Sequence, residues 1–170
     1  VDLYGEQVGG RLEDMASFAK YVGGSPTNIS IGSSRLGLKT ALITKVGDEH
    51  MGRFITEQLE REKVDISQVK IDPERLTALV LLGIRNQHQF PLIFFRENCA
   101  DMAITPEDIS RDFIASSKAT LVTGTHFSKT SVSEASFLAM KYAKDAGRRV
   151  VFDIDYRPNL WTLGSHNDGE

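Results

Sequence analysis

The sequence has a single cysteine, no long hydrophobic run and no strong excess of charge of either sign. The one cysteine, Cys99, excludes an internal disulfide and fits a reducing cytoplasm. No apolar run approaches the length of a membrane span, and no signal-peptide pattern opens the sequence. A net charge of −3 argues against binding to nucleic acid, which needs a basic surface. We therefore expect a cytoplasmic protein whose partner is a small molecule, with no nucleic acid and no membrane.

The 170 residues are enough for one domain with a real core, and 41% hydrophobic and 25% charged residues are ordinary for a globular protein. Segments typical of strands and helices alternate along most of the chain. Such alternation predicts right-handed βαβ units in a doubly wound, mostly parallel sheet. The expected elements are strands at 39–46, 119–123 and 149–154, and helices at 50–63, from Thr105, and from a capping box at Ser131 to a stop at Gly147.

Two regions interrupt this alternation. Residues 76–85 and 90–97 are both β-rich and are separated by Asn86-Gln87-His88-Gln89, which predicts a hairpin. Residues 1–22 also lack a convincing helix. Because a lone hairpin is marginally stable without packing, we expect these segments to pack on another part of the chain or to pair with a second copy of it. A simple edge hairpin is the alternative.

A glycine pair opens the most informative stretch. Gly23 and Gly24 allow close backbone approach or positive φ, and Ser25 and Pro26 suit the N-cap and first residue of a helix. Asn28 then lies in the first turn, with an amide that can both donate and accept hydrogen bonds. This combination suits a polyhydroxylated ligand, although an ordinary capped helix after a glycine turn has the same pattern.

The order of three motifs resembles the ribokinase-like (PfkB) carbohydrate kinases. The first motif runs from the glycine pair through Arg35-Leu36-Gly37-Leu38 to Lys45-Val46-Gly47-Asp48-Glu49-His50-Met51-Gly52. The second and third are Phe94-Phe95-Arg96-Glu97-Asn98-Cys99-Ala100-Asp101-Met102-Ala103 and Phe152-Asp153-Ile154-Asp155-Tyr156-Arg157-Pro158-Asn159-Leu160-Trp161. These two are most similar to the branch that phosphorylates keto-deoxy sugar acids, in particular 5-dehydro-2-deoxygluconate in inositol breakdown.

The resemblance implies an α/β fold with helices on both faces of a mostly parallel sheet and a small β-lid. Residues 1–22 and 76–97 would form the lid, which often contributes a dimer contact in this family. Residues 23–75 and 98–170 would form the N-terminal part of the kinase core. The family's Gly-Ala-Gly-Asp motif, with its catalytic aspartate, does not occur here, so we expect the base after Glu170 and no catalytic residue or activity in this piece alone. ATP and Mg²⁺ would bind mainly to that second half.

The resemblance also assigns the substrate-binding residues. Asp2, Gly23, Gly24 and Asn28 would contact sugar hydroxyls, while two arginines would bind the acid and keto end of the substrate. A planar guanidinium matches a carboxylate with two parallel hydrogen bonds, which favours arginine over lysine. The two are Arg96, at the end of a strand, and Arg157, in a loop after another strand. A strand-end arginine that reaches solvent or a neighbouring acid such as Glu97 is the alternative for Arg96.

Several questions stay open at this stage. Asp153 and Asp155 are close in sequence, but no third carboxylate joins them, and the sequence predicts no metal site. The role of His126, at the end of a strand, is undecided. The nearest alternative activity is 2-keto-3-deoxygluconate kinase or another sugar kinase of the family. A non-catalytic sugar-acid sensor is the alternative of a different class.

Overall fold

Three groups of paired strands organise the part of the chain that the structure, a computed structural model, describes: residues 1–156 and 158–161. The largest group is a four-stranded sheet in the order β2-β1-β5-β6. The other two groups are parallel pairs, β3 with β4 and β7 with β8. The strands are β1 (Asp2–Gly5), β2 (Phe18–Tyr21), β3 (Thr44–Gly47), β4 (Val69–Asp72), β5 (Leu79–Leu82), β6 (Leu92–Phe95), β7 (Ala119–Thr123) and β8 (Arg149–Asp153).

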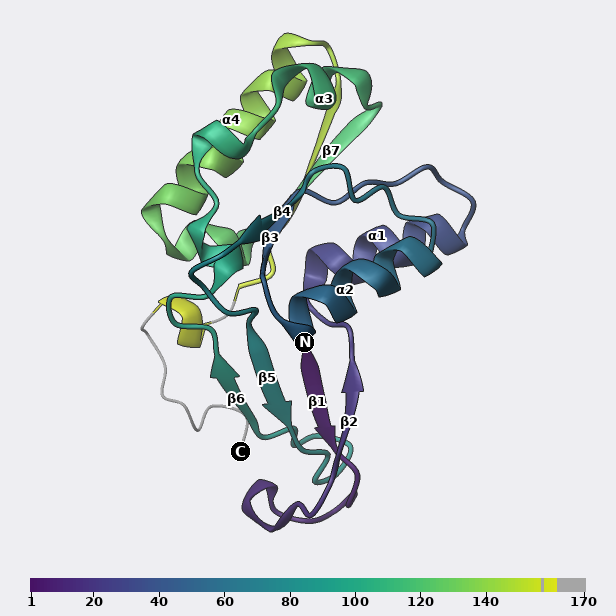
Figure 1. Cartoon of the computed structure of the whole chain (residues 1–170), viewed down its shortest axis with the longest axis vertical. Helices are drawn as coiled ribbons and strands as arrows, with labels where there is room; N and C mark the ends of the chain where they lie inside the picture. The colour runs from purple at the N-terminus through teal and green to yellow at the C-terminus, as the bar shows by residue number, and fades with distance from the viewer. Residues whose placement is uncertain (157, 162–170) are drawn as a thin grey trace.

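Four α-helices and several short 3₁₀ turns connect the strands. In Figure 1, α1 and α2 lie side by side in the middle of the molecule, and α3 and α4 lie at the end away from the four-stranded sheet. None of the described helices is long and apolar enough to cross a bilayer. The helices are α1 (Ser25–Arg35), α2 (His50–Arg61), α3 (Arg111–Ser116) and α4 (Thr130–Asp145), and the turns are η1 (Leu12–Asp14), η2 (Ala100–Ala103), η3 (Pro106–Asp108), η4 (Gly124–Ser128) and η5 (Pro158–Trp161).

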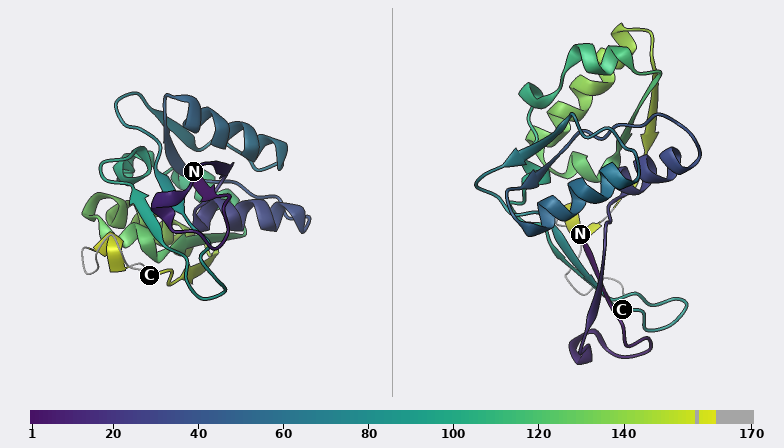
Figure 2. Two further views of the ribbon diagram at one scale, coloured as in Figure 1. Left: turned by 90° about the horizontal axis from the view of Figure 1, so that it is seen from below. Right: turned by 45° about the vertical axis from the view of Figure 1, so that its right-hand side comes forward.

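The four-stranded sheet, here called the lid sheet, projects from the helical body (Figure 1, Figure 2). β1 pairs antiparallel with β2 and parallel with β5, and β5 pairs antiparallel with β6. The hairpin turn between β5 and β6 is closed by the side chain of Asn86, which accepts hydrogen bonds from the N–H groups of His88 and Gln89. All four strands fall within residues 1–22 and 76–97, and β6 is an edge strand of the lid sheet.

The core is divided among three clusters. The largest gathers six buried residues from β3, α2, their flanking segments and the residue before β1: Val1, Leu42, Val46, Ile55, Leu59 and Val64. Leu3 and Leu79 of the lid sheet pack against it, so the base of the lid is continuous with the core. The other two clusters pack α4 through small residues, chiefly Ala135, Ala139 and Ala143, which let the neighbouring segments approach closely.

The expected helix starts are wrong in three places. Gly24, not Ser25, is the N-cap of α1, so Ser25 is already helical. The capping box at Thr105 is present, but it opens only the single turn η3, and α3 begins later, after its own cap at Ser110. Helix α4 begins at Thr130, without the capping box expected at Ser131.

Two strands also differ from expectation. The strand expected from residue 39 begins only at Thr44, although Ala41 forms an isolated bridge with Asp65. Strand β8 has the expected position, but Val151 and Phe152 are exposed in this chain rather than buried on both faces.

Candidate functional site

A polar cavity of about 590 Å³ lies between the lid sheet and the start of α1. Its walls come from β1, β2, the segment after β5 and the first turn of α1. A second hollow of about 570 Å³, beside η4 and β8, is lined almost entirely by aromatic and aliphatic side chains. A hydroxyl-rich ligand needs hydrogen-bonding groups, so the first cavity is the candidate site. Its lining residues are Asp2, Tyr4, Gly5, Glu6, Ala19, Tyr21, Val22, Asn28 and Ile84.

Asp2 and Gly23 meet at the inner end of this cavity. A Cβ atom at Gly23 would lie only 2.0 Å from Oδ2 of Asp2, so only glycine leaves room for the carboxylate where it stands. Burial raises the pKa of Asp2, and the positive charge of the Val1 amino group opposes part of that rise. The predicted contacts Asp2 and Gly23 therefore form one unit, in which the glycine leaves room for the acid at the cavity.

The start of α1 carries the other two predicted contacts. Gly24 adopts φ +92°, a conformation that strains any residue with a side chain, and its carbonyl accepts the N–H of Asn28 at 3.0 Å. Ser25 donates its hydroxyl to Oδ2 of Asp153 at 3.1 Å. This bond ties the helix start to the end of β8 and gives Asp153 a structural role that the sequence left undecided.

Asn28 projects from the first turn of α1 into the cavity and is exposed. Its side-chain amide has no hydrogen-bond partner among the described residues, so its donor and its acceptor are both available to a ligand. Across the cavity, Tyr4 and Tyr21 pack edge to face with ring centroids 5.5 Å apart. Sequence reasoning missed this aromatic wall, because the pairing of β1 with β2 that brings the two rings together is not visible in either segment alone.

Arg96 lies just after β6 and is mostly buried. Its Nε donates to Oδ2 of Asp101 at 2.7 Å, and its Nη2 contacts the same oxygen. The partner is thus a neighbouring acid, as the alternative reading of the sequence suggested, but it is Asp101 rather than Glu97.

Strand register relates Arg96 to the cavity. Asp2 is opposite Val80, and Val80 is opposite Phe94, so these three residues share one face of the lid sheet. Continuing the alternation by two residues places Arg96 on the face that carries Asp2, displaced towards the body of the molecule. The charges of Arg96 and Asp101 also act on the amino group of Val1, next to Asp2.

His126 in η4 lies near the same ion pair. Its Nδ1 is 3.2 Å from Oγ1 of the buried Thr123. Burial, with a smaller effect of the Arg96 charge, lowers the pKa of His126 to about 4, and Asp101 opposes the change. His126 is therefore neutral at pH 7 and belongs to the surroundings of the Arg96–Asp101 pair.

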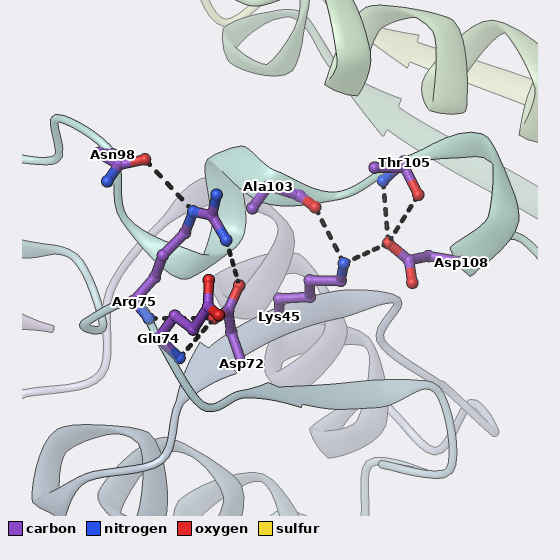
Figure 3. A network of polar contacts seen from close by, with 8 residues as sticks. All are labelled: Lys45, Asp72, Glu74, Arg75, Asn98, Ala103, Thr105 and Asp108. Carbon is purple, nitrogen blue, oxygen red and sulfur yellow. Dashed lines mark hydrogen bonds and ion pairs between the residues drawn. The ribbon is translucent and has the colours of Figure 1, made fainter.

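A polar network fixes the segment after β6 against the body (Figure 3). Lys45 of β3 donates to the carbonyl of Ala103 at 2.9 Å and pairs with Asp108 at 2.6 Å. Asp108 in turn accepts the N–H of Thr105, as expected from the capping pattern there. Farther along Figure 3, Arg75 donates to Asn98 at 3.2 Å. Arg96 and Asp101 lie within this anchored segment.

The motif from Lys45 to Gly52 joins the body to the base of the lid. Glu49 caps α2 by accepting from the N–H groups of Met51 and Gly52, and it also accepts the N–H of Thr77 at 3.2 Å. A Cβ at Gly47 would lie 2.6 Å from the carbonyl oxygen of Arg75. This motif therefore packs the lid base, and none of its residues lines the cavity.

Comparison with known proteins decides the family. Residues 1–168 match the pfkB family of carbohydrate kinases. The chain belongs to that family. It is 43% identical over 162 residues to 5-dehydro-2-deoxygluconokinase 1 of Bacillus cereus, with 95% of this chain and 49% of the relative covered. It is 41% identical to the 5-dehydro-2-deoxygluconokinase of Geobacillus kaustophilus, with 95% and 48% covered.

Solved structures of pfkB-family proteins confirm the ribokinase-like α/β fold. The PfkB protein from Polaromonas sp. JS666 superimposes with a TM-score of 0.88 at 29% identity, over 94% of this chain and 54% of that one. An uncharacterised Pyrococcus horikoshii sugar kinase in complex with ATP gives 0.87 at 28% identity, over 95% and 52%. The chain spans about half the length of the curated relatives that it matches.

In this pfkB-family chain, four of the six predicted site residues, Asp2, Gly23, Gly24 and Asn28, lie in or beside one cavity. Arg96 follows the edge strand of the same sheet, and Arg157 lies outside the described residues. Asp155 adopts φ +28° just after β8. Within residues 1–156 and 158–161, no group of three or more His, Cys, Asp or Glu side chains could hold a metal ion.

Proposed function

We propose that the full-length protein transfers the γ-phosphoryl group of ATP to the primary hydroxyl of a keto-deoxy sugar acid. The favoured substrate is 5-dehydro-2-deoxy-D-gluconate, an intermediate of myo-inositol degradation in the cytoplasm. The observation that carries this proposal is the 41–43% identity, over 162 residues, to proteins named as kinases of that sugar acid. The half of the protein represented here contributes the sugar-binding side of the active site.

The cavity chemistry supports a hydroxyl-rich substrate. The Asp2 carboxylate accepts hydrogen bonds from sugar hydroxyls, and the Asn28 amide both donates and accepts. Tyr4 and Tyr21 offer aromatic edges to the carbon skeleton of the sugar. Gly23 lies directly against the Asp2 carboxylate, and the backbone at Gly23 and Gly24 is the proposed contact beside it.

The carboxylate of the proposed substrate needs a positively charged side chain at one end of this site. Arg96 and Arg157 are the proposed partners, and a guanidinium binds a carboxylate more specifically than a lysine ammonium does. A neutral sugar would lack the anion for this further pairing, so we expect a preference for the acid.

The reaction places few demands on this half of the protein. The substrate hydroxyl loses its proton, its oxygen takes the γ-phosphoryl group, and ADP leaves, so catalysis depends on positioning and charge neutralisation. The proton acceptor is expected beyond Glu170. As the family resemblance implies, ATP and Mg²⁺ are expected to bind mainly to the second half.

A coupled assay of ADP release tests the proposal. The full-length protein should consume ATP with 5-dehydro-2-deoxygluconate faster than with 2-keto-3-deoxygluconate, ribose or fructose, and the 170-residue piece should be inactive. A preference for a neutral sugar would contradict the acid assignment. Saturable binding of the acid without any turnover would favour the sensor.

We also propose that the lid sheet contributes to a homodimer. Phe18, Phe90 and Phe95 on or beside its strands are each 37–54% exposed. Aromatic area of this size on a small sheet favours association with a second copy. Light scattering should give twice the monomer mass for the full-length protein, and Phe95→Lys should return it to the monomer mass.

A further inference from the structure

Asp101 meets Arg96 along one edge of the guanidinium only. Nε and Nη2 both contact Oδ2 of Asp101. Nη1 has no hydrogen-bond or ion-pair partner among the described residues. A guanidinium presents a second edge, formed by Nη1 and Nη2, that can bind another carboxylate with two hydrogen bonds. The pair with Asp101 leaves Nη1, and therefore most of that edge, available.

The ion pair is enclosed, with the side chains of Arg96 and Asp101 15% and 17% exposed. The second oxygen of Asp101, Oδ1, is fully buried and has no hydrogen-bond partner among the described residues. A buried pair with an unsatisfied oxygen stabilises a fold poorly, because desolvation offsets most of the attraction. Stability alone therefore does not account for an aspartate at this position.

The backbone around Asp101 is held firmly on both sides. The N–H of Ala100 donates to the carbonyl of Leu76 at 2.9 Å, and the carbonyl of Ala103 accepts from Lys45 at 2.9 Å (Figure 3). Asp101 thus holds the flexible arginine side chain from a fixed point in η2.

We propose that Asp101 is a positioning residue for acid recognition: it holds the Nε edge of Arg96 and so presents the second edge, with Nη1, to the carboxylate of the substrate. This inference rests on the proposed function and deepens it. A fixed guanidinium loses less conformational freedom on binding than a mobile one, and its second edge is aligned before the acid arrives. The opposite possibility is competition, in which Asp101 occupies the place of the substrate carboxylate.

The test uses the full-length protein and its Asp101→Asn variant, which keeps the shape and removes the charge. Calorimetry without ATP measures binding of 5-dehydro-2-deoxygluconate, and the coupled assay gives kcat and KM for the acid and for a neutral sugar. We expect acid binding to weaken and KM for the acid to rise by about tenfold, equivalent to about 1.4 kcal/mol. The neutral sugar and kcat should change little.

A double-mutant cycle separates positioning from other roles. In an Arg96→Ala background, Asp101→Asn should have no further effect on acid binding, because the arginine through which it acts is gone. Asp112→Asn, an exposed acid on α3, is the matched control and should behave as wild type. If Asp101→Asn does not fold, Asp101→Glu keeps the charge while displacing the guanidinium, and the same acid-specific loss is expected.

Each contrary result has a distinct meaning. Unchanged or tighter acid binding in Asp101→Asn would overturn the positioning role, and tighter binding would establish competition. Equal losses for acid and neutral sugar, or an undiminished effect in the Arg96→Ala background, would also overturn it while leaving the proposed function intact. A wild-type protein without any preference for the acid would overturn the proposed function and this inference together.

Discussion

Replacement of Gly23 by alanine should disturb the proposed binding site while leaving the fold almost unchanged. The new Cβ would lie 2.0 Å from Oδ2 and 2.1 Å from Cγ of Asp2, whereas real Cβ contacts essentially never fall below 3.0 Å. The Asp2 carboxylate must therefore move by about 1 Å or more, or turn to another rotamer. Because this carboxylate is the end of a side chain, that movement changes the strand pairing of β1 very little.

The expected loss is consequently in catalysis. Displacing a positioning group by about 1 Å can reduce the rate by roughly a hundredfold, so kcat/KM for the sugar acid should fall by about that factor in Gly23→Ala. The free energy of unfolding should fall by no more than about 1–3 kcal/mol, the usual range for overpacking. KM for ATP should stay unchanged, since Asp2 is proposed to contact only the sugar.

The measurement combines the coupled assay on the full-length protein with urea unfolding. Gly32→Ala is the matched control: it lies in α1, a Cβ there meets no atom within 4 Å, and alanine favours the helix by roughly 0.5–1 kcal/mol. It should be as active as wild type and slightly more stable. A Gly23→Ala protein with wild-type kcat/KM would refute the placement of Asp2 as a sugar contact.

Two further predictions concern stability. Glu49→Ala should lower the free energy of unfolding by about 1–2 kcal/mol, because the hydrogen bonds from Met51, Gly52 and Thr77 are lost. Glu49→Gln keeps an acceptor and should lower it less. Equal unfolding midpoints for wild type and Glu49→Ala would contradict this prediction. His126 has a pKa of about 4 in the folded state against 6.5 ordinarily, so between these pH values the unfolded state binds more protons than the folded state. The contribution of neutral His126 to the free energy of unfolding, roughly 3 kcal/mol at most, is fully present above pH 6.5 and is lost as the pH falls towards 4. Urea unfolding between about pH 4 and 7.5 should therefore show a shallower decline for His126→Gln than for wild type, and parallel curves would show that His126 titrates normally.

The order of strands and helices could be predicted because local patterns carry it. Strands β7 and β8 and the hairpin turn at Asn86 lie where alternation and turn residues place them. Helix starts were less accurate because tertiary contacts overrode local capping. Ser25 was expected to cap α1, but its hydroxyl is used by Asp153, which is 128 residues away in the chain.

The candidate site could be predicted only in part from the sequence, again because tertiary contacts decide which residues meet. Gly23 and Asn28 are predicted through the motif that contains them and Asp2 through the family resemblance, yet the contact of Asp2 with Gly23 depends on the pairing of β1 with β2. Asp101 lies within the second motif, but the sequence alone does not identify it as the partner of Arg96. An acid five residues after an arginine is a weak signal until η2 turns the chain back on itself.

Glycines in the motifs serve two different purposes, and the structure separates them. Gly47 and Gly52 permit close packing at the lid base: a Cβ at Gly52 would lie 2.0 Å from the carbonyl oxygen of Gly47, which cannot swing aside. Gly23 faces a movable carboxylate at the ligand cavity. Substitution at Gly52 should therefore unfold the lid base and lower stability and activity together, whereas substitution at Gly23 should act mainly on activity. The same residue type in one continuous motif thus allows close backbone packing at one position and leaves room for a carboxylate of the proposed sugar site at another, according to what a single added carbon would meet.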